Sequence, residues 1–156
     1  MEYDHMMLEL ALKEAENAYK IGEVPVGAVI VDSDRNPIGY GYNRTIVDND
    51  PTAHAEIVAI RSVAKNINNY RFSGMSLYVT LEPCLMCLGA IFSARITKVV
   101  FGAKDYKTGV CGSVINLPSL KEINHHTNVL QFNGDLVSNC SHILSKFFKN
   151  LRTSIS

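Results

Sequence analysis

The chain has 156 residues, of which 47% are hydrophobic and 19% are charged, and its fifteen basic residues balance its fifteen acidic ones. This length and composition favour a single domain over residues 1–156 and exclude a low-complexity or disordered chain. The formal net charge of zero excludes binding to a polyanion through bulk charge. A nucleic-acid partner would therefore have to contact a local basic patch.

The amino terminus has neither the basic region nor the uninterrupted apolar stretch of a signal peptide. No segment approaches the roughly 18–20 apolar residues that a membrane-spanning helix needs. We therefore expect a cytoplasmic protein that has no membrane partner. In that compartment the four cysteines are more readily metal ligands, redox groups or buried hydrophobic residues than disulfides.

The first third of the chain has the pattern of a helix followed by a hairpin. Apolar residues recur at helical spacing over residues 6–21, and Gly22 is placed to end that helix. Residues 24–31 form a compact apolar run, residues 32–37 have turn chemistry, and residues 38–42 can pair with the first run. We expect these two strands to be antiparallel.

The middle of the chain alternates helices and strands. Pro51 and Thr52 signal the start of a helix, whose apolar pattern ends near the asparagine-rich segment 66–69. The next elements are a buried strand at 77–80, a helix at 85–94 with Pro83 in its first turn, and a strand at 98–101. This alternation predicts an α/β protein whose sheet is largely covered by helices.

The last third begins with a glycine-containing loop over residues 104–112. A short strand is expected near residues 129–132, followed by a terminal helix whose apolar stripe runs from Val137 to Leu151. The basic residues Lys146, Lys149 and Arg152 lie off that stripe; by default they form a solvated helix face.

Two short motifs carry the strongest chemical signal. Cys84 and Cys87 are three residues apart at the start of a predicted helix, so both thiols face the same way. A helix amino terminus lowers the pKa of a thiol, which favours the thiolate that binds metal. With His54 as a third ligand, the set has three protein ligands and one open position, which is typical of catalytic zinc rather than structural zinc.

The spacing between the motifs allows these three ligands to converge. His54 and Cys84 begin successive helices, separated by a helix, a turn and a returning strand, and such helix starts lie near the same edge of a sheet. Glu56 lies two positions after His54, where its carboxylate can act as a general acid and base beside a metal-bound water. The pair H-x-E and P-C-x-x-C is an established signature of zinc-dependent nucleobase deaminases.

Other interpretations of the single motifs remain open. A lone C-x-x-C is also compatible with a redox pair or with half of a structural zinc knuckle, but neither explains the segment His54-Ala55-Glu56. Cys111 and Cys140 are expected to be inert, Cys140 because it lies on an apolar helix stripe. The sequence has no Walker P-loop and no complete dinucleotide fingerprint, so we expect no nucleotide cofactor.

On these motifs, the chain resembles the bacterial tRNA-specific adenosine deaminases of the cytidine/nucleotide deaminase superfamily. The resemblance covers nearly the whole chain. Its stretches are Gly22–Ala28, Asp50–Glu56, Leu77–Cys84, Val100–Asp105, Lys107–Gly109 and Phe147–Arg152. The zinc motifs indicate the superfamily, whereas the last two stretches indicate the tRNA branch.

The resemblance implies a three-layer α/β/α cytidine-deaminase-like fold around a five-stranded mixed central sheet. It also implies a homodimer with one zinc ion per subunit. The implied activity is hydrolytic deamination of adenosine to inosine at the wobble position of the tRNA anticodon, by a zinc-activated water and Glu56.

The resemblance also implies roles for residues that contact the substrate. Asn43 would hydrogen-bond the target purine and the backbone N–H of Ala55 would hold the purine's edge. Asp105 and Lys107 would lie in the loop that receives the anticodon. The remaining implied RNA contacts are Asn124 and His125 near the flipped base, and Lys149 and Arg152 at the RNA backbone. His126 stands where the family often has arginine, so no phosphate contact is carried over to it.

Two other functions stay open from the sequence. A free-base or nucleoside deaminase acting on guanine or cytosine would share the zinc motifs. A structural zinc module or a nucleic-acid-binding module without catalysis would share the metal ligands and leave Glu56 without a function.

Overall fold

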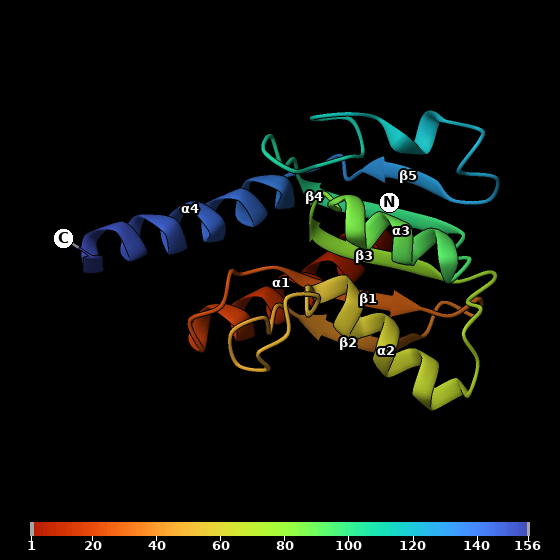
Figure 1. Cartoon of the computed structure of the whole chain (residues 1–156), viewed down its shortest axis with the longest axis horizontal. Helices are drawn as coiled ribbons and strands as arrows, with labels where there is room; N and C mark the ends of the chain where they lie inside the picture. The colour runs from red at the N-terminus through yellow and green to blue at the C-terminus, as the bar shows by residue number, and fades with distance from the viewer. Residues whose placement is uncertain (1, 156) are drawn as a thin grey trace.

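A five-stranded sheet lies between two layers of helices in the computed structural model, which describes residues 2–155 (Figure 1). The elements in chain order are α1 (Glu2–Lys20), β1 (Gly27–Val31), β2 (Pro37–Tyr42), α2 (Ala55–Ile67), β3 (Ser76–Leu81), α3 (Leu85–Ser93), β4 (Lys98–Ala103), the 3₁₀ turn η1 (Leu117–Ser119), β5 (Asn128–Gln131) and α4 (Leu136–Ile155).

The sheet is mixed, with the strand order β2-β1-β3-β4-β5. Strand β1 is antiparallel to both of its neighbours, β2 and β3, whereas β4 and β5 run parallel to β3. All strands except β1 therefore point the same way. As a result, the carboxyl ends of β2 and β3 lie at the same edge of the sheet, and the segments leading to α2 and α3 start there.

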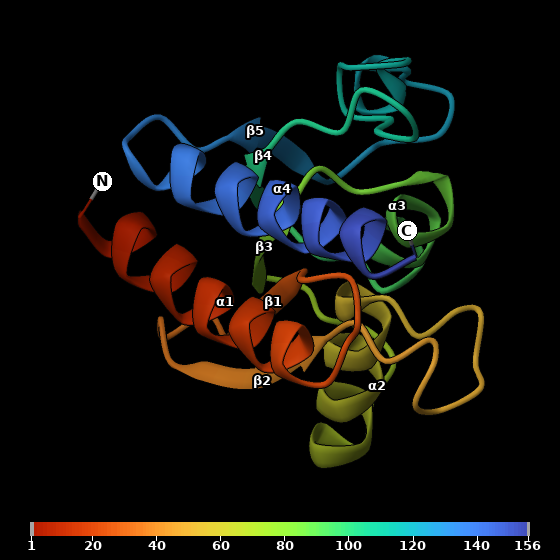
Figure 2. The same cartoon turned by 90° about the vertical axis from the view of Figure 1, so that its left-hand side faces the viewer.

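Helices cover both faces of the sheet, α2 and α3 on one and α1 and α4 on the other (Figure 2). The alternation of side chains along β1 follows this division. Ala28 and Ile30 pack in the cluster that contains the buried residues of α2 and α3, whereas Val29 packs against Leu8 of α1 and Cys140 of α4. The expected three-layer α/β/α fold with a five-stranded mixed sheet is confirmed.

Helix α1 begins four residues before the predicted start, because its first turn is tied to the sheet. The Tyr3 hydroxyl donates a hydrogen bond to the backbone carbonyl of Arg35 over 2.8 Å. The Asp4 carboxylate accepts one from Tyr78 over 2.5 Å and pairs with Lys98 at 3.5 Å. These contacts involve polar side chains and distant strands, so the apolar periodicity of the helix did not indicate them.

The predicted strand at 24–31 is shorter than expected, since β1 begins only at Gly27. Pro25 has no backbone N–H to donate to a sheet, and the N–H of Val26 is used in a tight turn back to the carbonyl of Val24. The hairpin of β1 with β2 is antiparallel, as predicted.

Helix α2 begins later than its start signal at Pro51 and Thr52, whereas helix α3 begins at Leu85, as predicted. Asp50 accepts hydrogen bonds from the N–H and the hydroxyl of Thr52, which forms a turn and delays the start of α2 to Ala55. Pro83 lies just before the capping residue Cys84, and so outside the first turn of α3, where it was predicted.

None of the helices within residues 2–155 is both long enough and apolar enough to cross a membrane.

Gly41 of β2 allows α2 to lie close to the sheet, and this contact can be tested. A Cβ atom at Gly41 would lie 2.3 Å from the carbonyl oxygen of Ala55 and 2.6 Å from the nitrogen of Ala59. We expect Gly41→Ala to lower the free energy of unfolding by roughly 1–3 kcal/mol, because the added methyl group overpacks the contact. Urea denaturation measures this change. Gly89→Ala is the control: its Cβ meets nothing within 4 Å, so it should stabilise α3 by about 0.5–1 kcal/mol. A Gly41→Ala protein as stable as wild type would contradict this packing.

Candidate metal and catalytic site

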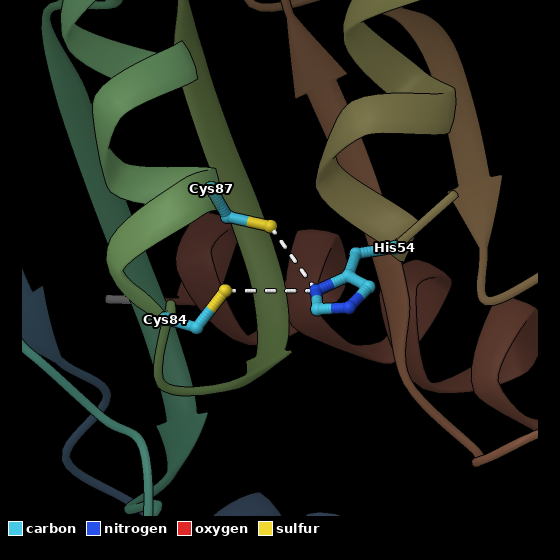
Figure 3. A group of neighbouring side chains, drawn as sticks. All are labelled: His54, Cys84 and Cys87. Atoms are coloured by element: carbon cyan, nitrogen blue, oxygen red, sulfur yellow. Dashed lines mark hydrogen bonds between the residues drawn. The ribbon is translucent and has the colours of Figure 1, made fainter. Parts of the chain in front are cut away.

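Two helix starts bring three metal-binding side chains together (Figure 3). His54 is the amino-terminal capping residue of α2, and Cys84 is the capping residue of α3. Both have extended backbone angles. Cys87 lies one turn into α3 and is buried. The expected convergence of the two helix starts is therefore present.

The distances between the three ligand atoms suit a single tetrahedral metal ion. The Nδ1 atom of His54 lies 3.6 Å from the sulfur of Cys84 and 3.4 Å from the sulfur of Cys87. For zinc bound tetrahedrally with its usual bond lengths to nitrogen and sulfur, the N···S separation would be about 3.5 Å. Within residues 2–155, this is the only group of three His, Cys, Asp or Glu side chains close enough to hold an ion. The residues fit zinc.

Electrostatic interactions within the group favour one thiolate. A hydrogen bond from the Cys87 thiol, together with His54, lowers the pKa of Cys84 to about 4. The same hydrogen bond, together with burial, raises the pKa of Cys87. The Cys84 sulfur raises the pKa of His54. A cation entering the group would therefore find one negative sulfur already formed.

Glu56 lies in the first turn of α2 and is only 4% exposed. Burial raises the pKa of its carboxyl group to about 7, with the Cys84 thiolate adding to the effect. A carboxyl group with a pKa near neutrality can both accept and return a proton at physiological pH. Its position therefore suits general acid and base chemistry.

A pocket of about 200 Å³ opens beside these residues. Its wall has apolar side chains from the segment before β1 and from the end of β3. Its polar side chains come from the segments that follow β2, β3 and β4 and from the first turn of α2. The lining residues are Val24, Val26, Asn43, His54, Glu56, Leu81, Glu82, Cys84, Asp105 and Thr108. Of the residues singled out from the sequence, Asn43, His54, Glu56, Cys84 and Asp105 thus share one pocket.

Asn43 and Ala55 were expected to contact a purine separately, but in this structure they bind each other. The backbone N–H of Ala55 donates a 2.8 Å hydrogen bond to Oδ1 of Asn43. This bond fixes the orientation of the Asn43 amide and leaves its Nδ2 to donate to a ligand. The Ala55 N–H is committed to Asn43 and so holds a residue of the pocket wall.

Asp105 organises the loop on the other side of the pocket. Its Oδ1 accepts hydrogen bonds from the N–H groups of Lys107 and Thr108, and its Oδ2 accepts one from the Thr108 hydroxyl. Thr108 thereby lines the pocket, whereas the side chain of Lys107 is exposed outside it.

The remaining sequence-predicted residues lie away from the pocket. Asn124 and His125 are in the segment between η1 and β5, where the Asn124 amide donates to the carbonyls of Pro118 and Thr127. Lys149 and Arg152 are exposed on α4, which extends beyond the rest of the molecule (Figure 1).

Glu82 and Thr108 also line the pocket but were not predicted from the sequence. The signal for Glu82 was available: a carboxylate at the end of an apolar strand, next to the proline before Cys84, has to be buried close to the metal ligands. Thr108 carried no such signal, because its place in the pocket depends on the fold of its loop.

The other two cysteines are separate from the metal group. Cys140 is fully buried between α1, α4 and the sheet, and burial raises the pKa of its thiol to about 12. Burial also raises the pKa of Cys111 to about 12. A larger cavity of about 390 Å³ lies between α1 and α4, but none of the three metal-binding side chains lines it.

Comparisons with known proteins agree with this site. Residues 1–103 match the family model for the cytidine and deoxycytidylate deaminase zinc-binding region. A tRNA-specific adenosine deaminase of Haemophilus influenzae is 52% identical over 151 residues, which cover 97% of this chain and 86% of the relative.

Two solved structures are also similar. One, from a study of A-to-I editing by tRNA:A34 deaminases at the wobble position, is 42% identical with a TM-score of 0.83 and covers 90% of this chain and 99% of its own. The other, a guanine deaminase of Bacillus subtilis, is 33% identical with a TM-score of 0.63 and covers 96% and 93%. With its zinc-binding region and its near full-length match to tRNA-specific relatives, the chain belongs to the tRNA-specific adenosine deaminases within the cytidine and deoxycytidylate deaminase family.

Proposed function

We propose that this protein converts adenosine to inosine at the wobble position of tRNA by hydrolytic deamination. The observation that carries the proposal is the convergence, at one pocket, of the buried Glu56 carboxylate with a His/Cys/Cys metal site. The identity of 52% to a tRNA-specific adenosine deaminase supports the choice of substrate. A tRNA substrate also supports a cytoplasmic location.

One zinc ion per chain would be held by His54, Cys84 and Cys87. When bound, zinc supplies the Lewis acidity that makes a water molecule nucleophilic near neutral pH. Three protein ligands leave one position of a tetrahedral site open, as catalysis requires.

Glu56 would move the protons of the reaction. Its carboxylate takes a proton from the attacking water and delivers it to ring nitrogen 1 of adenine, while the water oxygen bonds to ring carbon 6. The proton of the hydroxyl group on carbon 6 then passes through Glu56 to the amino group. The bond from carbon 6 to that nitrogen breaks as the carbon–oxygen double bond forms, and ammonia leaves. Burial holds the pKa of Glu56 at about 7, so the group can accept and release protons at similar cost.

The pocket suits one base with the rest of the RNA outside it. Its volume of about 200 Å³ is below the roughly 300–1,000 Å³ of sites for drug-sized ligands. The Nδ2 of Asn43 can donate to a purine acceptor, and Asp105 and Thr108 form the opposite wall. A wobble base lies in a single-stranded loop, so bringing it into the pocket costs only a few kcal/mol.

Contacts to the rest of the anticodon stem-loop would come from outside the pocket. Lys107, Lys149 and Arg152 are exposed cations on the pocket loop and on α4. They would contact phosphates through local charge, without a high net charge of the chain. Asn124 would contribute through the shape of its loop, since its side chain bonds that loop internally, and His125 through its exposed side chain.

A homodimer is part of the proposal. Large apolar side chains are exposed on the segments that border the pocket, and a second copy of the chain would cover them. They are Ile46 and Val47 after β2, Leu85 and Met86 at the start of α3, and Val114 and Ile115 after β4.

Deamination of a free base is the second candidate function, because the guanine deaminase of Bacillus subtilis has the same fold at 33% identity. The two candidates differ in whether the base must be part of an RNA.

Zinc binding predicts a pattern of thiol reactivity. In the zinc-loaded protein at pH 8, we expect no thiol to react rapidly with a disulfide reagent: zinc would cover Cys84 and Cys87. The pKa values of about 12 for Cys111 and Cys140 keep those thiols protonated and slow to react at this pH. Removal of zinc by a chelator should expose one reactive thiol, that of Cys84, because the pKa of the buried Cys87 thiol is raised. The far-ultraviolet circular dichroism should stay unchanged. Equal reactivity of all the cysteines before and after chelation would exclude this site.

Activity should require Glu56 and an RNA substrate. With an anticodon stem-loop carrying adenosine at the wobble position, we expect inosine by chromatography of the digested RNA. Glu56→Gln should lower the rate by about 10²–10⁴-fold, because the proton carrier is lost, with zinc content unchanged by atomic absorption. Release of ammonia from guanine or cytosine, with none from the RNA, would instead support the second candidate. An unchanged rate in Glu56→Gln would mean that the carboxylate carries no proton.

The dimer can be tested by sedimentation equilibrium. We expect a mass of about twice 17.3 kDa, and a shift toward the monomer in Leu85→Glu, because a charge would be buried without a partner. Tyr70→Glu is the control, since Tyr70 is 70% exposed on the segment after α2, away from the pocket. A monomeric wild-type protein would remove the homodimer from the proposal.

A further inference from the structure

Glu82 is a buried carboxylate that the proposed chemistry does not use. It is 2% exposed and lies between the end of β3 and Cys84. Within residues 2–155, no Lys, Arg or His forms an ion pair with it. Burying a carboxylate costs several kcal/mol unless hydrogen bonds replace its water, so its partners show what it does.

All of those partners belong to the loop that follows β4. Oε1 accepts hydrogen bonds from the N–H of Asp105 over 3.1 Å and from the hydroxyl of Ser113. Oε2 accepts them from the N–H groups of Cys111 over 2.9 Å and Ser113 over 3.1 Å. One carboxylate thus holds both ends of the segment 105–113.

The middle of the segment folds closely around the same carboxylate. A Cβ atom at Gly109 would lie 2.5 Å from Oε2 of Glu82 and 2.5 Å from the carbonyl oxygen of Asp105. The side chain of Asp105 in turn bonds to Lys107 and Thr108. A chain of contacts therefore runs from Glu82 through Asp105 to Thr108, and all three line the pocket.

We propose that Glu82 is a positioning residue for the deaminase: its carboxylate holds the loop 105–113 so that Asp105 and Thr108 face the base in the pocket. This inference rests on the proposed function. Glu82 acts through the loop and transfers no proton.

The substitution Glu82→Gln tests this role because neither orientation of the amide satisfies the loop. With the NH₂ group at the Oε2 position, it would face the N–H groups of both Cys111 and Ser113. At the Oε1 position the Ser113 hydroxyl can turn to accept from it, but the N–H of Asp105 loses its acceptor. The second orientation loses one backbone hydrogen bond and the first loses two, so we expect the amide to adopt the second and the loop to be released at Asp105.

Glu23 offers a matched control. It is also buried, at 1% exposure, and its Oε2 accepts from the N–H groups of Ile46 and Val47 at 2.9 and 2.7 Å. Its Oε1 lies 3.2 Å from the Thr45 hydroxyl, which can reverse and accept from an amide. Oε1 also lies 3.2 Å from the Ile46 N–H, which keeps its shorter bond to Oε2. Glu23→Gln can therefore keep the backbone hydrogen bonds, and we expect its activity to stay within about threefold of wild type.

The experiment combines amide exchange with kinetics per bound zinc. In Glu82→Gln we expect the Asp105 amide to exchange about tenfold faster, with Cys111 and Ser113 little changed. We expect kcat/KM on the anticodon stem-loop to fall about 10–100-fold, through both KM and kcat, with zinc content unchanged. A purely structural role would lower the melting temperature and leave KM and kcat per bound zinc at wild-type values, and that result would overturn the proposal.

Two results of this experiment call for a further variant or measurement. If Glu82→Gln does not fold, Gly109→Ala replaces it, because its Cβ would push the loop away from Glu82 while the carboxylate stays intact. A roughly 10–100-fold lower kcat/KM in Gly109→Ala, through both KM and kcat, would support the proposal. Wild-type kinetics would overturn it. If wild-type protein with zinc makes no inosine, the proposed function fails, and the Asp105 exchange rate alone decides whether Glu82 holds the loop.

Discussion

The site depends on the direction of one strand. Because β1 lies between β2 and β3 and is antiparallel to both, β2 and β3 point the same way and end at the same edge of the sheet. The segments that follow them therefore place His54 and Cys84 as capping residues of adjacent helices, 3.6 Å apart at their ligand atoms. The close approach of α2 to Gly41 completes this arrangement, since a bulkier residue would displace the helix start that follows His54.

Two buried carboxylates near the metal group have different surroundings and so different chemistry. Glu56 loses water without gaining enough hydrogen bonds, and burial raises its pKa to about 7, which suits proton transfer. Glu82 accepts four hydrogen bonds from one loop, which suits a side chain that holds structure. The pocket thus has one acid able to titrate at working pH and one that orders a wall. Both carboxyl groups are almost fully buried, so burial does not distinguish them. Their different roles follow from the number of hydrogen-bond donors around each.

Local periodicity and motif spacing predicted a sheet covered by helices and the metal group, and the family resemblance implied the three layers and the mixed five-stranded sheet. The sequence predicted less about contacts between distant segments. The early start of α1 depends on Asp4 meeting Tyr78 and Lys98, and the start of α2 at Ala55 depends on the turn around Asp50. The bond between Asn43 and Ala55 and the contacts of Glu82 with its loop require the folded positions of residues far apart in the chain. The expected RNA contacts of Lys149 and Arg152 stay predictions.

We propose that His54, Cys84 and Cys87 hold one zinc ion with a fourth position open. X-ray absorption at the zinc edge of the purified protein tests it most directly, because this method counts the sulfur and the nitrogen or oxygen neighbours of the metal. We expect two sulfur atoms at about 2.3 Å and two nitrogen or oxygen atoms at about 2.0–2.1 Å, with loss of one sulfur in Cys87→Ser. Four sulfur neighbours, or zinc absent from a protein that does not take it up, would contradict the claim.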